Sequence, residues 1–277
     1  MDEDDLTDTQ YYILDKFKHG ENIFITGPGG VGKSYLIKHL INHCVIEGIR
    51  YQVCALTGCA AILLGSKAKT IHSWSGIYRC DKEEIEIIKQ ISKNWAIRTN
   101  WKKIQVLIVD EISMMSKKML SCLDQLGKRF RKNTLPFGGI QVVFCGDFFQ
   151  LPPINEDEFC FESDVWNNLF IRENHVELTE IFRQKDKQFI EILAEIRKGK
   201  LSATNLQVIE ERLKIEAPED ITLLSPKKFI VDRINQSKFH QLDQTIQESN
   251  IVIRYDEINY IHTQIPIPPE KKKQLNE

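Results

Sequence analysis

The stretch GPGGVGKS, from Gly27 to Ser34, decides the fold of this chain. It matches G-x-x-x-x-G-K-[ST], the pattern of a glycine-rich turn between a buried strand and a helix. The flanks agree, because NIFIT at 22–26 is a short apolar run and residues 34–47 place apolar side chains at helical spacing. A glycine turn with a chance lysine is the alternative, and the flanking strand and helix disfavour it. The predicted phosphate-binding loop consists of Gly27, Pro28, Gly29, Gly30, Val31, Gly32, Lys33 and Ser34.

The physical basis of this prediction is the backbone of the loop. Glycines let the chain fold tightly and point its N–H groups inward, where the helix N-terminus adds partial positive charge. Lys33 is then expected to reach the β- and γ-phosphates of a nucleoside triphosphate, and the Ser34 hydroxyl to bind Mg²⁺. The loop therefore predicts a nucleoside triphosphate as substrate and Mg²⁺ as cofactor.

The second motif is acidic, and its Asp110 lies 77 positions after Lys33. Residues 106–109 (VLIV) are apolar and largely β-branched, as in a strand buried on both faces, and Asp110 and Glu111 follow at its end. Open parallel sheets place their ligand sites at that end of the strands. We expect Asp110 to hold Mg²⁺ and Glu111 to orient the attacking water as general base.

Composition limits the class of protein only broadly. With 277 residues and 42% hydrophobic content, the chain suits one large or two modest domains with a real core. No apolar run approaches the ~20 residues that span a bilayer, and the acidic start MDEDD is unlike a signal peptide. We expect no membrane partner, no secretion signal and an intracellular location. The net charge of −2 could hide a local basic groove, so a nucleic-acid partner has to be argued from motifs.

Metal and disulfide frameworks are not expected. The seven cysteines include no C-x-x-C pair, which favours reduced and buried side chains. The seven histidines include no H-E-x-x-H arrangement.

Along the chain, strands and helices are expected to alternate. Further strands are predicted at 51–56 and 141–146 and a helix at 117–131, which together indicate a doubly wound parallel α/β sheet. Residues from about 78 to 103 are interpreted as a small insertion. After 177 the pattern predicts helices at 187–198, 202–213 and 227–242, strands at 221–225 and near 251, and a frayed tail from 266.

Six blocks in order carry a resemblance to a known family. They are LTDTQ (6–10), GPGGVGKS (27–34), LTGCAAILLGSKAKTIHSWSGI (56–77), VLIVDEISMM (106–115), VVFCGDFFQLPPI (142–154) and LTEIFRQKDKQFIEILAEIRKG (178–199). This series resembles the Pif-type DNA helicases of superfamily 1B, relatives of the RecD helicases, over most of residues 6–240. GDFFQLPP together with TIHSW is specific to that group among loop-containing ATPases. The resemblance implies a RecA-like ATPase domain 1A at 1–177 and the start of a second, incomplete RecA-like domain at 178–277.

The resemblance also implies roles for residues outside the loop. Gln10 resembles the family's adenine-reading glutamine, whose amide can donate and accept hydrogen bonds; a plain surface glutamine is the alternative. Gln150 resembles the residue that touches the γ-phosphate and reports its loss, although it could be a turn residue before two prolines. Arg183 resembles an arginine finger that stabilises charge on the transferred phosphoryl group, with a structural ion pair as the alternative.

Single-stranded DNA contacts are implied for the segment around TIHSW, where hydroxyl and backbone N–H groups would meet phosphates. The candidates are Thr57, Gly58, Thr70, His72 and Ser73. His72 could instead be an ordinary packed histidine. Trp74 could stack on a base or belong to the core, and the basic-aromatic stretch 93–103 could approach DNA or be a solvated face.

The implied function is an ATP-dependent 5′→3′ DNA helicase or its motor core, acting on single-stranded or tailed duplex DNA. Replication, repair, recombination and telomere maintenance are the implied processes, in the nucleus or cytoplasm.

Blocks resembling VTVHKAQG and YVALSR, which family members carry further on, are absent. We therefore expect a truncated polypeptide, a split-gene product whose second lobe is another polypeptide, or the N-terminal portion of a longer helicase. The main alternative is an ATP- and single-strand-binding module without unwinding activity. TIHSW and GDFFQLPP disfavour another ATPase such as a replication loader or AAA-type remodeller.

Overall fold

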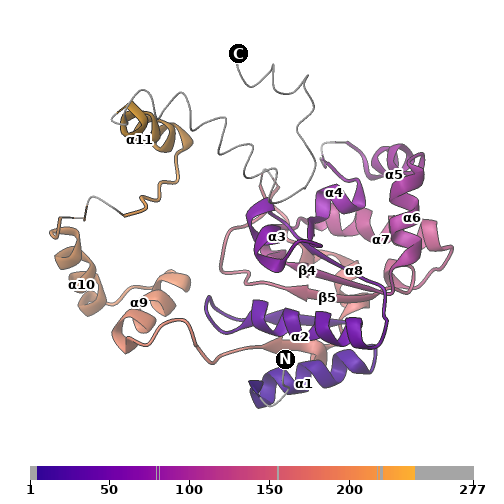
Figure 1. Ribbon diagram of the computed structural model, residues 1–277, viewed down its shortest axis with the longest axis horizontal. Coiled ribbons are helices and arrows are strands. Elements are labelled where there is room, and N and C mark those ends of the chain that lie inside the picture. The colour runs from indigo at the N-terminus through magenta and orange to yellow at the C-terminus, as the bar shows by residue number, and fades with distance from the viewer. Residues whose placement is uncertain are drawn as a thin grey trace. The chain divides into compact units, whose positions relative to one another are not determined.

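The computed structural model describes residues 5–240 except 79, 81, 155, 217, 219 and 220. The chain divides into two compact units, residues 1–209 and 210–277. The first unit contains a parallel sheet with helices on both faces (Figure 1).

The sheet of the first unit has six strands in the order β3-β2-β4-β5-β1-β6, and every neighbouring pair is parallel. The strands are β1 (Ile23–Thr26), β2 (Tyr51–Ala55), β3 (Lys69–Thr70), β4 (Val106–Asp110), β5 (Gln141–Cys145) and β6 (His175–Glu177). All five residues of β4 are buried, as expected for an apolar strand covered on both faces. β5 lies between β4 and β1, so the carboxyl ends of these three strands meet at one edge of the sheet.

The connections between the strands are mostly helical. The helices are α1 (Asp8–Lys18), α2 (Lys33–Ile46), α3 (Gly58–Leu64), α4 (Ile71–Ser75), α5 (Glu84–Ser92), α6 (Trp95–Lys103), α7 (Lys117–Arg131), α8 (Asp164–Leu169), α9 (Lys187–Arg197), α10 (Ala203–Leu213) and α11 (Lys228–His240). Short 3₁₀ turns are η2 (Ile112–Met114), η3 (Pro136–Gly138), η4 (Cys160–Glu162) and η5 (Arg172–Asn174). The alternation of strand and helix confirms the predicted α/β class.

Two hydrophobic clusters fill the two faces of the sheet. One joins α1, α2 and α3 to the strands through residues such as Leu14, Leu40 and Ile108. The other cluster packs the helices α4, α5, α6, α7 and α8 against the opposite face through residues such as Leu107 and Leu123. Figure 1 shows α1 and α2 together on one side and α5, α6 and α7 on the other. This three-layer packing fixes the carboxyl edge of the sheet as a rigid platform.

The expected insertion at 78–103 forms α5 and α6, which pack onto α7. Trp101 of α6 is fully buried, and its ring centroid lies 4.6 Å from that of Trp74. Trp74 is also buried, which assigns it to the core rather than to a DNA base. Trp95, at the start of α6, is exposed.

The structure differs from the sequence pattern in several short elements. The predicted strand at 221–225 is wrong, because these residues have no strand geometry and the described part of their unit offers no strand to pair with. Conversely, α1, β3 and β6 form without having been predicted. The strand expected near 251 and the tail from 266 lie outside the described residues.

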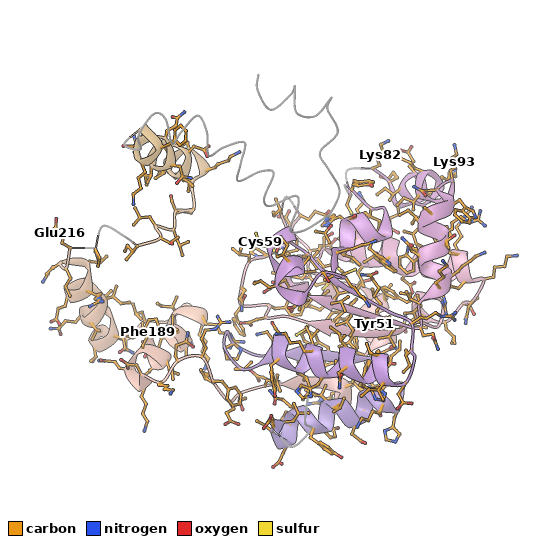
Figure 2. All side chains as sticks on the ribbon, in the orientation of Figure 1. Tyr51, Cys59, Lys82, Lys93, Phe189 and Glu216 are labelled. Carbon is orange, nitrogen blue, oxygen red and sulfur yellow. The ribbon has the colours of Figure 1, made fainter. Side chains whose placement is uncertain are left out.

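Side-chain placement bears on the cysteines and on membrane insertion. Five cysteines are buried, Cys80 is half-buried and Cys59 is exposed on α3 (Figure 2). Burial raises the pKa of the Cys44 thiol to about 11, which keeps that thiol protonated. Within the described residues, no helix is both long and apolar enough to cross a membrane.

Candidate active site

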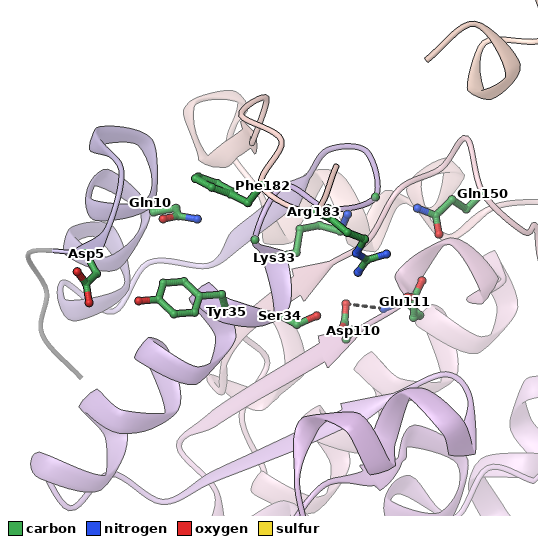
Figure 3. A pocket seen from close by; sticks show the side chains of 13 residues that line it. Asp5, Gln10, Lys33, Ser34, Tyr35, Asp110, Glu111, Gln150, Phe182 and Arg183 are labelled. Atoms are coloured by element: carbon green, nitrogen blue, oxygen red, sulfur yellow. Dashed lines mark hydrogen bonds between the residues drawn. The ribbon is translucent and has the colours of Figure 1, made fainter. Parts of the chain in front are cut away.

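A pocket of about 580 Å³ lies at the carboxyl edge of the sheet (Figure 3). Its lining includes Gln10, Gly29, Gly30, Gly32, Lys33, Ser34, Asp110, Glu111, Gln150 and Arg183. These side chains come from separate segments: α1, the loop after β1, the end of β4, the loop after β5, and the segment after β6. Figure 3 shows Gln10 and Gln150 at opposite ends of the pocket. The structure thus brings together the residues for which nucleotide chemistry was predicted.

The phosphate-binding loop has the backbone that its glycines predict. Gly30 and Gly32 have φ angles of +89° and +84°, in the left-handed region that favours glycine. The Lys33 ammonium donates hydrogen bonds to the carbonyl oxygens of Gly27 and Pro28, at 2.7 and 2.8 Å. Val31 is buried in the core, so its side chain anchors the loop.

Asp110 and Glu111 lie where β4 ends. The Glu111 N–H donates to Asp110 Oδ1 at 2.9 Å (Figure 3). Asp110 is only 6% exposed, and burial raises its pKa, with the charge of Lys33 opposing the rise. The pKa of Glu111 is also raised, first by burial and then by the charge of Asp110.

Glu111 has an unusual backbone conformation. Its φ and ψ are 58° and 41°, in the left-handed region that non-glycine residues rarely adopt. Such strain is typical of functional sites, where the surrounding structure holds one residue in a required orientation. Here it turns the chain away from β4 directly after Asp110, so the two carboxylates face the same pocket.

The donor set suits a small, hard cation. Mg²⁺ binds oxygen and needs only one or two protein ligands beside phosphates and water. Ser34 supplies a hydroxyl and Asp110 a buried carboxylate with raised pKa, which a nearby cation would keep ionised. Clusters of three or more His, Cys, Asp or Glu side chains fit for a metal are absent from the described residues. The residues present therefore fit Mg²⁺ bound together with a nucleotide.

Gln10 closes one end of the pocket. It is 2% exposed, which excludes a surface glutamine. Its Oε1 accepts the Thr7 N–H at 3.1 Å, while Thr7 Oγ1 accepts the Gln10 N–H at 3.3 Å, a capping box at the start of α1. The amide NH₂ group lies beside Gly32. The carbonyl of the side chain is thus engaged by the cap, and the NH₂ group is the part left for a ligand.

Arg183 is carried into the pocket by a segment that runs along the loop. The Leu178 N–H donates to the Thr26 carbonyl at 2.8 Å, and the Phe182 N–H donates to the Gly30 carbonyl at 2.9 Å. Figure 3 shows the Arg183 guanidinium pointing toward Asp110 and Glu111. The described residues give Arg183 no ion-pair partner, unlike the structural ion pair that was its alternative.

Two residues at this site had no predicted role. Asp147, two residues after the end of β5, is buried, and Arg197 of α9 binds both of its oxygens: Nε to Oδ2 and Nη2 to Oδ1, each at 2.8 Å. Gln150 Nε2 also donates to Asp147 Oδ2, at 3.2 Å. Both residues stood inside blocks quoted for the resemblance, and a buried acid after a strand was the available signal for Asp147.

The DNA candidates lie at the carboxyl ends of β2 and β3 and in the first turns of the helices that follow them. Thr57 and Thr70 are N-caps of α3 and α4, since each Oγ1 accepts a backbone N–H at 3.2 Å, and their O–H groups remain able to donate. Gly58 begins α3 and Ser73 lies within α4. His72 is half-buried, and burial lowers its pKa, so the imidazole is neutral at physiological pH.

A second pocket, of about 600 Å³, adjoins His72. Leu56, Met114, Pro153 and Tyr78 also line it, together with the polar Ser116 and the acidic Glu156, so its surface is mixed in polarity. Tyr78 is 76% exposed, and sequence reasoning gave it no role. An exposed aromatic ring beside a neutral imidazole can stack on a flat, apolar ligand face.

Comparison with known proteins identifies relatives of this chain. The family model described as PIF1-like helicase matches residues 5–207. "ATP-dependent DNA helicase PIF1" of Emericella nidulans is 35% identical over 84% of this chain, which spans 32% of that relative's length.

Solved structures give the same assignment of fold. The crystal structure of Pif1 helicase from Candida albicans is similar with a TM-score of 0.79 and 36% identity, covering 86% of this chain and 55% of that one. Pif1 helicase from Bacteroides, in complex with ADP-AlF3 and ssDNA, is similar with a TM-score of 0.71 and 29% identity, covering 86% and 58%. The chain thus spans about a third to somewhat over half of the relatives that it matches.

Proposed function

Because this chain belongs to the PIF1-like helicase family, we propose that it is an ATP-hydrolysing DNA helicase motor, or the N-terminal core of one. The observation that carries the proposal is the convergence of Lys33, Asp110, Glu111, Gln150 and Arg183 on one pocket. A loop for phosphates, two acids and an arginine are the parts that hydrolysis of a nucleoside triphosphate requires.

Each residue has a role that its position allows. The loop N–H groups and Lys33 bind the β- and γ-phosphates, and Glu111 accepts a proton from the water that attacks in line. Arg183 stabilises the charge that develops on the transferred phosphoryl group, and Gln150 hydrogen-bonds the γ-phosphate. Ser34 and Asp110 would hold Mg²⁺, which supplies neutralising charge to the phosphate oxygens when bound. The NH₂ group of Gln10 donates to the adenine edge.

Single-stranded DNA is the proposed second ligand. Thr57, Gly58, Thr70, His72 and Ser73 would lie along the strand, with hydroxyl and backbone N–H groups on phosphates. The pocket that His72 lines supports this path, because the exposed Tyr78 ring in the same lining offers a stacking surface. The likeness to a Bacteroides Pif1 solved with ADP-AlF3 and ssDNA also supports it.

Broader aspects follow from the family. We propose 5′→3′ movement on single-stranded or tailed duplex DNA in replication, repair, recombination or telomere maintenance, in the nucleus or cytoplasm. We propose residues 1–177 as domain 1A and 178–277 as the beginning of a second RecA-like domain. Movement needs two lobes that grip the strand in turn. The blocks resembling VTVHKAQG and YVALSR would therefore come from further sequence or a second polypeptide.

The decisive experiment is ATP hydrolysis with and without single-stranded DNA, for the native chain, Lys33→Ala and Glu111→Gln. Hydrolysis stimulated by DNA and abolished by both substitutions supports the motor. Tight binding of ATP and DNA without turnover supports the alternative of a binding module. A rate that responds to neither DNA nor substitution contradicts the proposal. Unwinding of a 5′-tailed duplex, with and without an added second polypeptide, then tests whether the chain moves alone.

A further inference from the structure

The segment that carries Arg183 is attached to the site a second time, fourteen residues later, through Arg197. The first attachment is the hydrogen bond from the Phe182 N–H to the Gly30 carbonyl, at 2.9 Å. The second is the two-point ion pair of Arg197 with Asp147, at 2.8 Å for each bond. Between them Asp186 caps α9, its Oδ1 accepting the Phe189 N–H at 3.1 Å. The strap from Arg183 to Arg197 is therefore mostly a capped, rigid helix.

Asp147 of this ion pair also accepts a hydrogen bond from Gln150, the proposed γ-phosphate sensor. Asp147 Oδ2 accepts from both Arg197 Nε, at 2.8 Å, and Gln150 Nε2, at 3.2 Å. The carbonyl of Asp147 accepts the Gln150 N–H at 2.8 Å, so the two residues are joined twice. A Gln150 amide that turns toward a γ-phosphate must leave Oδ2, and this changes the hydrogen-bonding of the acid that holds Arg197.

Arg197 is a principal anchor of α9. Ile192 is the helix's only buried residue, and the Arg197 guanidinium lies over the Phe149 ring, 4.4 Å from its centroid. Burial alone would raise the pKa of Asp147, but the hydrogen bonds from Arg197, Phe149 and Gln150 outweigh it and hold that pKa below its usual range. Removing one partner of a largely buried ion pair is strongly destabilising, because it leaves an uncompensated charge. The acid that holds Arg197 of α9 is therefore the same acid that Gln150 hydrogen-bonds.

We infer that Asp147 and Arg197 are positioning residues that relay the presence of the γ-phosphate from Gln150 to α9 and the Arg183 segment. The inference rests on the proposed function, since it assigns a response to the same nucleotide site. Thermodynamic linkage gives the relay a measurable consequence. If the γ-phosphate changes the stability of the Asp147–Arg197 ion pair, then breaking that pair must change the affinity for an ATP analogue relative to ADP. An ion pair that only packs α9 against its unit would lower stability without changing that ratio.

Hydrogen–deuterium exchange on the full chain tests the relay without relying on turnover. Exchange is measured in the loop (27–36) and in α9 (187–197), with Mg²⁺ and either ADP or ATPγS. In the native chain we expect both nucleotides to protect the loop and ATPγS to change exchange in α9 relative to ADP. Arg197→Gln and Asp147→Asn are expected to abolish the α9 difference. The ratio of ATPγS to ADP affinity should shift by about fivefold or more, the lower range of measured couplings.

Lys117→Gln is the control for loss of a cation, because it breaks an exposed ion pair, Lys117 Nζ to Glu158 Oε1 at 2.6 Å, outside the strap. It should leave the α9 difference intact. Arg197→Lys keeps the charge without the two-point geometry, and should also lose the difference; it replaces Arg197→Gln if that variant is unfolded by circular dichroism. An α9 difference that persists in the folded variants, or is absent from a native chain whose loop is protected, overturns the relay. An unprotected loop in the native chain overturns the proposed function and the relay with it.

Discussion

Gly30 and Arg183 pack so closely that a Cβ on Gly30 would lie 2.8 Å from the Cβ of Arg183 and 3.0 Å from Gln184 Oε1. The phosphate-binding loop and the arginine segment are thus fitted to each other. Because the neighbouring Phe182 N–H also donates to the Gly30 carbonyl, the loop itself positions the guanidinium over the two acids.

Gly30→Ala is expected to displace Arg183 and to strain the loop, since φ at this position is +89°. We predict at least about a tenfold loss of DNA-stimulated ATP hydrolysis, which corresponds to about 1.4 kcal/mol in the barrier. Gly29→Ala is the control, because a Cβ there meets nothing within 4 Å and Gly29 lies outside the left-handed region. Equal losses in both variants would contradict the role of the Gly30–Arg183 contact.

Gln10 takes part both in the cap of α1 and in the lining of the pocket. Gln10→Glu keeps an oxygen that accepts the Thr7 N–H and so retains the cap of α1, but it removes the NH₂ donor. We predict ATP affinity reduced about tenfold, the scale of one lost hydrogen bond. The melting temperature should fall as well, because a carboxylate at this 2% exposed position is poorly solvated. Gln10→Ala removes cap and donor, and should lower both. Titration with a fluorescent ATP analogue and thermal melting measure the two effects; undiminished ATP affinity in Gln10→Glu would exclude the adenine contact.

The two acids are expected to oppose folding in the absence of nucleotide and metal. Burial raises the pKa of Asp110, so its ionised form is less stable in the folded than in the unfolded chain. Its contribution to stability is full below the unfolded pKa and is lost as pH rises through the higher folded pKa. Asp110→Asn should therefore raise the melting temperature at pH 7.5, by about 2–4 °C for about 1 kcal/mol.

The matching measurement is thermal melting in EDTA at pH 7.5 and at pH 5. The gain from Asp110→Asn should shrink at the lower pH, which is closer to the raised pKa of Asp110, because a larger fraction of the native carboxyl is then protonated. The amide oxygen that this substitution introduces can still accept the Glu111 N–H, so that hydrogen bond is kept. A lower melting temperature for Asp110→Asn at pH 7.5 would show that the carboxylate is stabilised by more than the described contacts.

Local patterns were sufficient for the central elements of the fold. GPGGVGKS with its flanks, and VLIVD at 106–110, carry their strand, turn and helix signals within a few residues. β3 and β6 have two and three residues and form by pairing with β2 and β1, which no local pattern encodes. The opposite case is the run at 221–225. Its composition suits a strand, but no strand forms there because a strand needs a partner to pair with.

Long-range contacts limited the prediction of the site in the same way. Asp147 and Arg197 are 50 residues apart, and the sequence around neither residue predicts their ion pair. Trp74 could be an exposed stacking residue or a core residue by sequence, and only its packing on Trp101 distinguishes them. Which residue carries which catalytic role stays a prediction, supported by a pocket that brings them together.

The path of the DNA strand can be tested with two aromatic residues of equal exposure. Tyr78 is 76% exposed and lines the pocket next to His72, whereas Trp95 is 75% exposed on α6, in the basic-aromatic stretch 93–103. Stacking on a base contributes about 1–3 kcal/mol, so Tyr78→Ala should weaken binding of a labelled oligothymidine by about fivefold or more. Trp95→Ala should change it less than about twofold, as expected for a solvated face.

Fluorescence anisotropy at low and physiological salt completes the comparison. Affinity should fall as salt rises, because phosphate contacts release counterions. The slope should be the same for Tyr78→Ala as for the native chain, since tyrosine carries no charge and His72 is neutral. If Trp95→Ala weakens binding and Tyr78→Ala does not, the strand runs over α6 instead, and the assignment of Thr57, Thr70 and His72 to the DNA path is wrong. A flat salt response in the native chain would contradict phosphate binding on either face.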